Sequence, residues 1–431
     1  MIRQPGTGTM AGTFLLVLIV CLGPLPFGSV LVRERTILDV LACLALVAIL
    51  GTRRGPRPFG RAPWPALALC ALGLWGLFQA LPWPMGSPLS IAPTVSRDAA
   101  WHGLAVAAAF LAASLAGEQR PARQAMGLGF LVITLFQVFY GARQWAGDGS
   151  VVWGMEVAGD STRLRGTYIN ANHLAFFLSM ALATFTAWLW WGVRRAAWPG
   201  PIEQRLIHPL APALCFSLAF FGIAFSGSRA GLLAAILGIL AMGVLLGIHH
   251  RRWQAGLVAG GLILAALGSV AWLGWRQGFS RLLVSSTEFE AGWGSRLEVY
   301  RLSWHLWLDS SPWTGTGLGT FRQAFPAVQP SSLGRTWVHA HNDWLELLVT
   351  TGVVGALLLV FGLSTLIRRL WTVFQKGRRS EDRAAGLAAL GALATAALHS
   401  LFDFGIAIPA NAFTLAILCG AACGASTDEA P

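Results

Sequence analysis

The chain has 431 residues, of which 55% are hydrophobic and 12% are charged, roughly half the charged fraction of ordinary soluble domains. A mean hydropathy of +0.60 and repeated apolar runs of about 20 residues exclude a soluble globular protein and predict an all-α integral membrane protein. The net charge of +12 is common in nucleic-acid-binding proteins, but most of the basic residues follow membrane topology, so we expect no nucleic-acid partner.

About twelve apolar segments are predicted to cross the membrane. The first resembles a signal peptide, but its apolar run is longer than usual for one and a second span follows at once, so we expect a helix. The second, 36–51, has only sixteen residues and carries Asp39. The predicted spans are 11–32, 36–51, 64–81, 100–116, 125–140, 171–192, 209–225, 231–248, 255–274, 342–366, 384–401 and 407–424.

The distribution of Lys and Arg sets the orientation of these spans. With the N-terminus inside, more than half of the 31 Lys and Arg residues fall in inner loops, so we expect both termini in the cytoplasm. A long outer loop, 275–340, joins the ninth and tenth helices, and its amphipathic pattern around Tyr300 and Trp304 predicts that it folds over the membrane surface. The predicted outer segments are 33–35, 82–99, 141–170, 226–230 and 275–340.

Polar residues are costly near lipid, so their clusters indicate candidate sites. The first cluster is the turn Ser226–Gly231, which contains Ser228 and Arg229. It opens a helix whose N-terminus faces outward, where free N–H groups, hydroxyls and a guanidinium form an anion site. The alternative is a tight turn whose arginine extends to lipid head groups.

The second cluster lies at the outer end of the sixth span and contains candidate substrate-binding residues. Helix capping by its Asn and His side chains is the alternative interpretation. The third cluster pairs Arg296 with Arg301 in the long loop, where a solvated amphipathic helix would also account for them. The residues of the second cluster are Arg163, Arg165, Gly166, Asn170, Asn172 and His173.

The fourth cluster runs from His339 into the tenth span. Asn342, Glu346 and Thr350 share one helix face at a spacing of four residues, which extends a polar stripe into the outer leaflet. A histidine at the start of such a stripe can take a proton from a hydroxyl. We expect His341 to be this base and His339 to lie outside the helix, in water. A His-x-His metal site is the competing interpretation.

No metal or cofactor is expected. The six cysteines all lie within apolar segments, which indicates neither disulfides nor a zinc site, and the chain contains no Asp-x-Asp pair to hold a metal diphosphate. The glycine-rich stretch 315–319 lacks the spacing and the preceding strand of a nucleotide-binding loop.

Together, these motifs resemble the O-antigen ligase and polymerase superfamily of bacterial membrane glycosyltransferases. The strongest match is His341-Asn342 followed after nine residues by Gly352 and after two more by Gly355. The resemblance spans about 163–366, so we expect this to be the catalytic region, preceded by helices 1–5 in 1–162 and followed by helices 11 and 12 in 367–431. The other matching segments are Ser226–Gly231, 165–173, Ser311-Pro312 and 315–321.

The resemblance implies a GT-C-like fold in the bacterial inner membrane with its active site facing the periplasm. It implies a metal-independent, inverting transfer of a glycan from an undecaprenyl-diphosphate-linked donor, as in lipopolysaccharide biosynthesis. His341 matches the family's proposed base and Arg229 its diphosphate-binding arginine. Arg296 resembles the second such arginine, with Arg301 close enough to leave that assignment open.

The sequence leaves several functions open within this superfamily. A ligase would transfer the glycan to lipid A-core, and a polymerase would use a growing glycan as acceptor. Arg143 and Gly154, and likewise Arg281 and Gly292, are separated by ten residues as in the polymerase pattern. A protein O-oligosaccharyltransferase and a non-enzymatic transporter are further alternatives, although a transporter should show polar residues at the membrane midplane and a repeat of its two halves.

Overall fold

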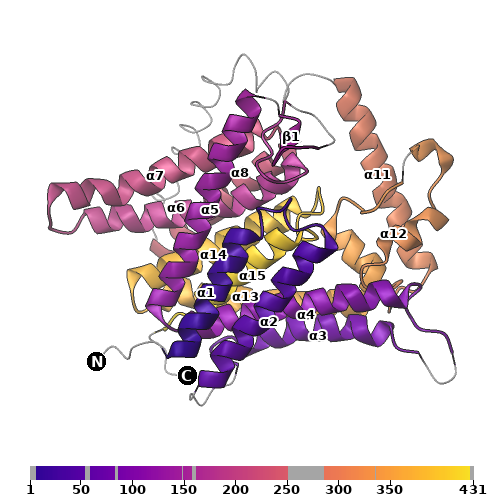
Figure 1. The fold of residues 1–431 in the computed structure, drawn as a ribbon, viewed down its shortest axis with the longest axis horizontal. Helices are drawn as coiled ribbons and strands as arrows, with labels where there is room; N and C mark the ends of the chain where they lie inside the picture. Colours follow the sequence, from indigo (N-terminus) through magenta and orange to yellow (C-terminus); the bar gives the residue numbers. More distant parts are fainter. Residues whose placement is uncertain are drawn as a thin grey trace.

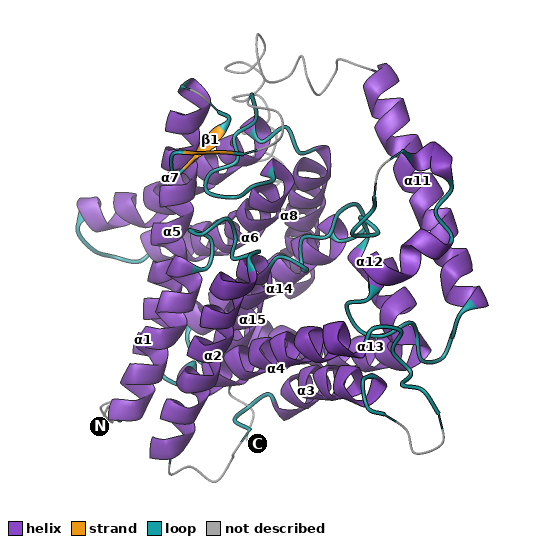
Figure 2. Cartoon of the chain, turned by 45° about the vertical axis from the view of Figure 1, so that its right-hand side comes forward, coloured by secondary structure: helices purple, strands orange, loops and turns teal. Residues whose placement is uncertain are grey.

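The computed structural model describes residues 6–53, 59–82, 86–147, 149–157, 162–250, 286–334 and 336–427. These residues form thirteen α-helices, two short 3₁₀ helices and one two-stranded hairpin (Figures 1 and 2). The helices are α1 (Thr7–Leu22), α2 (Val32–Thr52), α3 (Pro63–Gln79), α4 (Pro93–Ala116), α5 (Arg120–Ala146), α6 (Ala171–Ala196), α7 (Ile202–Phe225), α8 (Arg229–His250), α11 (Ser286–Asp309), α12 (Phe321–Ala324), α13 (Asp343–Lys376), α14 (Ser380–His399) and α15 (Pro409–Cys423); the strands are β1 (Val151–Val152) and β2 (Met155–Glu156), and the 3₁₀ helices are η1 (Phe325–Ala327) and η2 (Ser331–Leu333).

Each predicted span except 255–274, which lies outside the described residues, coincides with one of these helices. Among the described residues, seven helices are long and apolar enough to cross a membrane, namely α2, α4, α5, α6, α7, α8 and α13, and α1, α3 and α15 are shorter apolar helices. The protein is therefore an all-α, multi-pass membrane protein, and the count of twelve spans stays a prediction.

The predicted end of the first span is wrong. Helix α1 ends at Leu22 rather than at residue 32. Pro24 and Pro26 follow directly, and proline both lacks a backbone N–H and disfavours helical geometry at the residue before it. The chain then turns through positive φ angles at Phe27, Gly28 and Ser29, and Phe27 forms a β-bridge with Tyr168. The turn thus fixes the C-terminal end of α1 to the segment before α6.

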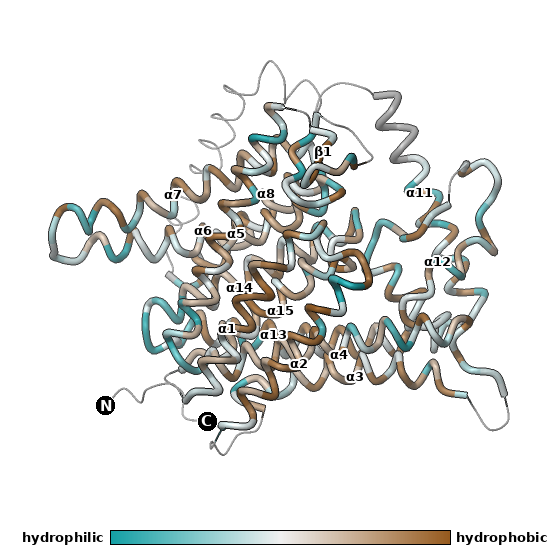
Figure 3. The backbone as a smooth tube through the Cα atoms, viewed as in Figure 1, coloured by the Kyte–Doolittle hydropathy of each residue, from teal (hydrophilic) through white to brown (hydrophobic). Residues whose placement is uncertain are grey.

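Helix α6 is the most buried of the seven long apolar helices. It packs against α7 and α14, and 78% of its most apolar window is buried. Small residues allow close approach elsewhere in the bundle, as where Gly420 of α15 lies against the backbone of Phe110 in α4. In Figure 3 the residues of α14 and α15, inside the bundle, are mostly coloured as hydrophobic.

Several arginines of the predicted inner loops bind the last carbonyl groups of helices. Arg369 donates to the carbonyl oxygen of Cys423 at 2.8 and 3.0 Å, Arg383 to that of Gly377 at 2.8 Å, and Arg205 to that of Ala196 at 3.1 Å. Cations are favourable at helix C-termini because the helix dipole is negative there. These residues therefore stabilise the ends of the helices at which they lie.

Helix α13 is interrupted at Gly352, whose φ of 64° and ψ of −167° are non-helical. The glycine-rich segment before η1 fills this break: the N–H groups of Thr316 and Gly317 donate to the carbonyls of Val349 and Thr350 at 3.0 and 2.9 Å. The buried Gln79 side chain also donates to the carbonyl of Thr350, at 3.0 Å. The carbonyls of Val349 and Thr350 at the break are thus hydrogen-bonded, and the positive φ explains why residue 352 is a glycine.

The predicted loop 275–340 contains an ordered helix. Helix α11 packs against α13, and Val299 and Leu306 join Phe321, Phe325 and Trp337 in a small apolar cluster separate from the main core. Figure 2 shows α11 and α12 standing beside the bundle rather than within it. The amphipathic helix predicted for this segment is therefore present.

We predict that Ser332, in η2, faces the periplasm and that Glu203, in α7, faces the cytoplasm. Both residues are exposed, so cysteines placed there on a background without native cysteines should react with an impermeant maleimide from their own side. Labelling of Ser332→Cys before the inner membrane is permeabilised, and of Glu203→Cys only afterwards, is expected. The reverse order would mean that the orientation is inverted.

Gly352→Ala is expected to destabilise the protein at the break in α13. An added Cβ would overlap the carbonyl group of Trp313, and a non-glycine residue at this positive φ costs about 1–3 kcal/mol in addition. Thermal unfolding of the purified protein in detergent should show a clearly lowered Tm. Gly51→Ala is the control, because nothing lies within 4 Å of a Cβ at Gly51; equal Tm values for the two variants would contradict this account.

Candidate active site

The segment Ser400–Ile406, which joins α14 to α15, brings the polar clusters together. At its centre, Asp403 has a side chain only 1% exposed. Its Oδ1 accepts a hydrogen bond from Nδ1 of His341 at 3.1 Å, and its Oδ2 accepts one from the Asn172 amide at 2.7 Å. Burial by itself raises the pKa of this carboxyl, but the His341 hydrogen bond, followed by the charges of His173, His341 and Arg296, outweighs it and holds the pKa well below its usual range.

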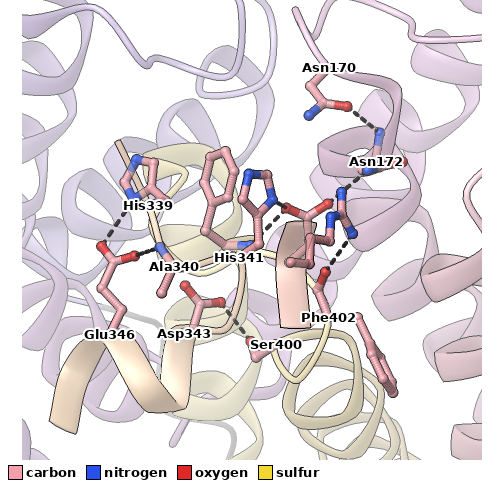
Figure 4. Close-up of polar contacts among 12 residues, drawn as sticks. Asn170, Asn172, His339, Ala340, His341, Asp343, Glu346, Ser400 and Phe402 are labelled. Atoms are coloured by element: carbon pink, nitrogen blue, oxygen red, sulfur yellow. Dashed lines mark hydrogen bonds and ion pairs between the residues drawn. The ribbon is translucent and has the colours of Figure 1, made fainter. Parts of the chain in front are cut away.

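His341 lies directly before the N-cap of α13, in a left-handed backbone conformation with φ of 53°. Its ring contacts Trp337 and Phe404 edge-on, with centroids 5.4 and 4.9 Å away. Its carbonyl accepts a hydrogen bond from the Tyr300 hydroxyl of α11 at 2.7 Å. With Nδ1–H directed at the Asp403 carboxylate, Nε2 is the ring nitrogen that can accept a proton. The arrangement therefore orients a histidine as a base (Figure 4).

Arg163 links the Ser226–Gly231 turn to this carboxylate. Its Nε donates to the carbonyl of Ser226 at 2.6 Å, and its guanidinium donates to Oδ1 of Asn172 at 2.6 Å. Asn172 in turn donates to Asp403. A continuous chain of hydrogen bonds thus runs from the C-cap of α7, through the start of α6, to His341.

The turn itself is closed by its own serines. The Ser228 hydroxyl, 3% exposed, accepts from the N–H of Gly231 at 3.1 Å, and that of Ser226 accepts from the N–H of Ser228 at 3.2 Å. Ser228 therefore acts as the N-cap of α8, in which Arg229 is the first residue. A direct contact of Ser228 with substrate stays a prediction.

The two arginines of α11 differ sharply in their surroundings. Arg296 donates to the carbonyl of Phe402 at 3.0 Å, next to Asp403. Arg301 is 61% exposed and forms an ion pair with Glu298 one turn away at 2.7 Å. The structure thus brings Arg296 to the Asp403 cluster and leaves Arg301 on the outer surface.

The expectation that His339 lies in water is wrong. It does precede the helix, but its ring stacks on Phe404 with centroids 4.1 Å apart, and its Nδ1 lies 2.9 Å from Oε1 of Glu346. Burial lowers the pKa of His339, while the hydrogen bond and charge of Glu346 raise it, and the net shift is upward. His339 is held in place because its ring stacks on Phe404 and its Nδ1 is hydrogen-bonded to Glu346.

The predicted polar stripe on α13 is used mainly for hydrogen bonds within the protein. Asn342 is the N-cap, and its Oδ1 accepts from the N–H of Leu345 at 3.1 Å. Glu346 turns back to accept from the N–H of Ala340 at 2.9 Å, and the Thr350 hydroxyl donates to the carbonyl of Glu346 at 2.8 Å. These side chains thus fix the peptide that carries His341.

The remaining predicted residues lie inside the protein or at the start of α6. Asn170 is the N-cap of α6 and accepts from the N–H of Asn172 at 2.9 Å. Arg165 is 2% exposed and donates to the carbonyl of Ile169 at 3.4 Å. His173 is 7% exposed and contacts Phe404 edge-on at 4.7 Å. A substrate role for these three residues stays a prediction.

Sequence reasoning missed Asp403 and the role of Asp343. Asp343 accepts from the Ser400 hydroxyl at 2.8 Å and from the N–H of Ile406 at 3.1 Å, so it fastens both ends of the connecting segment. A signal for Asp403 was available: it lies between the predicted spans 384–401 and 407–424, on the same outer side as the other clusters. Among the described residues, no group of three His, Cys, Asp or Glu side chains is placed to hold a metal ion.

A comparison with protein-family models matches residues 214–360 to the O-antigen ligase family, whereas no curated protein matches the chain. The match confirms the resemblance derived from the motifs. It runs from α7 into α13 and includes Arg229, Arg296 and His341. Asn172 and Asp403, which complete the hydrogen-bonded cluster, lie outside the matched segment.

Proposed function

We propose that this chain, which carries an O-antigen ligase segment, is an inner-membrane glycosyltransferase whose active site faces the periplasm. It would move a glycan from undecaprenyl diphosphate onto an acceptor hydroxyl, with lipid A-core as the acceptor of a ligase. The observation that carries the proposal is the bond between His341 and the buried Asp403 carboxylate, beside Arg296. This combination provides a base and a cation at one surface.

The reaction follows from these groups. Nε2 of His341 takes the proton of the acceptor hydroxyl, and the oxygen attacks the anomeric carbon from the face opposite the diphosphate. The bond from that carbon to the diphosphate oxygen breaks, undecaprenyl diphosphate leaves, and the configuration inverts. Arg229 and Arg296 stabilise the charge that grows on the leaving group, as a metal ion does in other transferases.

Asp403 orients the base in this mechanism. Since its carboxylate stays ionised, it fixes the Nδ1–H tautomer of His341 and stabilises the imidazolium that forms when the proton is taken up. Asn172 donates to the other carboxylate oxygen from the α6 side, and Arg163 holds Asn172 in turn. Each of these three residues is a positioning residue, because it acts through His341.

His341→Ala is expected to lower turnover by about 10²-fold or more, which is the usual contribution of a general base. Donor binding should be largely retained, because the arginines remain. His339→Ala is the matched control, and a loss below about 10-fold is expected since His339 only lines the site. Steady-state kinetics of the purified, folded variants measure these two losses. A dead His339→Ala with a normal His341→Ala would move the base to the other histidine.

Arg296→Gln should impair transfer far more than Arg301→Gln. The first substitution removes the cation beside Asp403, at a cost of about 10²-fold if it stabilises charge in the transition state. The second breaks an exposed ion pair, which contributes at most about 1 kcal/mol to stability. Rates of glycan transfer for the two variants provide the comparison; equal losses would remove Arg296 from the proposed diphosphate site.

The proposed function is tested with purified protein, a lipid-linked glycan donor and EDTA. Transfer should continue at the same rate, because arginines replace the metal, and undecaprenyl diphosphate should be released as glycan reaches the acceptor. Loss of turnover that Mg²⁺ or Mn²⁺ restores would contradict the mechanism. Offering both lipid A-core and a second lipid-linked glycan separates ligase from polymerase, since a polymerase lengthens only the latter.

A further inference from the structure

Helices α5, α6 and α14 surround an open cavity of about 480 Å³. The cavity lies toward the end of the bundle that the sequence predicts to be cytoplasmic, far from the His341 cluster at the opposite ends of α6 and α14. Its walls are mainly apolar. They include Leu128 and Leu131 of α5, Phe185 and Trp188 of α6, and Ala385 and Ala388 of α14.

The lining is polar at one end and apolar at the other. Arg120 and Glu381 line the cavity at the first turns of α5 and α14, where they form an ion pair at 2.7 Å. Trp191 lies at the same end, and its indole N–H donates to Ser380 at 3.1 Å. Leu131 lies eleven residues after Arg120, about 16 Å along the helix and close to the depth of one leaflet. The cavity thus has the polarity of a lipid molecule.

Its size also fits a hydrocarbon chain. A cavity of roughly 150 Å³ binds benzene, which has six carbons, so a volume of about 480 Å³ accommodates about eighteen carbons, or one acyl chain. At this depth no water is available to fill an apolar space. The molecules that can reach it from the bilayer are lipids.

We propose that this cavity binds one acyl chain of an inner-leaflet phospholipid, whose phosphate lies beside Arg120. Arg120 pairs with Glu381, and the neighbouring Arg123 pairs with Asp382, so each arginine of the lining already has an anionic partner. Recognition therefore depends on the acyl chain rather than on head-group charge. The site is independent of the transferase reaction proposed above.

Gly127 offers a direct test. It lines the cavity, and nothing lies within 4 Å of a Cβ at this position, so Gly127→Phe should fill the space without disturbing the helices. Gly51→Phe is the matched control, because Gly51 is equally open and lies on α2, outside the lining. Native mass spectrometry would measure lipid binding to the purified full-length protein in detergent, with phosphatidylglycerol and phosphatidylethanolamine of identical chains as probes.

The wild type and Gly51→Phe should retain one lipid, with equal affinity for the two head groups, and Gly127→Phe should bind it at least about 10-fold more weakly because several buried methylenes are displaced. Unchanged binding to a folded Gly127→Phe, or no retained lipid in the wild type, would refute the site. A strong preference for phosphatidylglycerol would refute recognition by the chain. If Gly127→Phe does not fold, Ala385→Leu narrows the cavity from α14 and carries the same expectations.

Discussion

The buried carboxylate of Asp403 is the group on which this end of the helix bundle depends. An ionised carboxylate away from water is costly unless it is hydrogen-bonded and faces a cation. Here His341, Asn172 and the N–H of Phe404 donate to it, and Arg296 binds the adjacent carbonyl. Satisfying this one charge therefore brings together the starts of α6 and α13, the middle of α11 and the α14–α15 connection.

A second constraint, the break in α13 at Gly352, sets the position of the segment above the site. The carbonyls released by the break bind the glycine-rich stretch that follows α11, and Gln79 ties the same stretch to α3. The small apolar cluster of Val299, Phe321 and Trp337 then holds α11 over α13. Tyr300 and Arg296 consequently reach the His341 cluster from a segment that is not part of the main core.

Hydropathy was sufficient to predict most helices, because apolar runs and their polar boundaries are local features. The polar clusters could also be found, since charge near lipid is unusual wherever it occurs. The hydrogen-bonding partners within the clusters were not predicted. Asp403 lies 62 residues after His341 and 231 residues after Asn172, and no local sequence pattern links residues so far apart. His339 was misplaced for the same reason: Phe404, on which it stacks, belongs to a connection that the sequence gives no cause to place beside it.

The central claim is that Asp403 acts on the reaction through His341, and a double-mutant cycle in turnover tests it most directly. Asp403→Asn should reduce kcat by about 10- to 100-fold with little change in KM, and adding His341→Ala should bring the rate only to that of His341→Ala alone. Coupling of this kind identifies the pair as one unit. If the two losses multiply instead, Asp403 supports the fold independently of His341, and the account of an oriented base is contradicted.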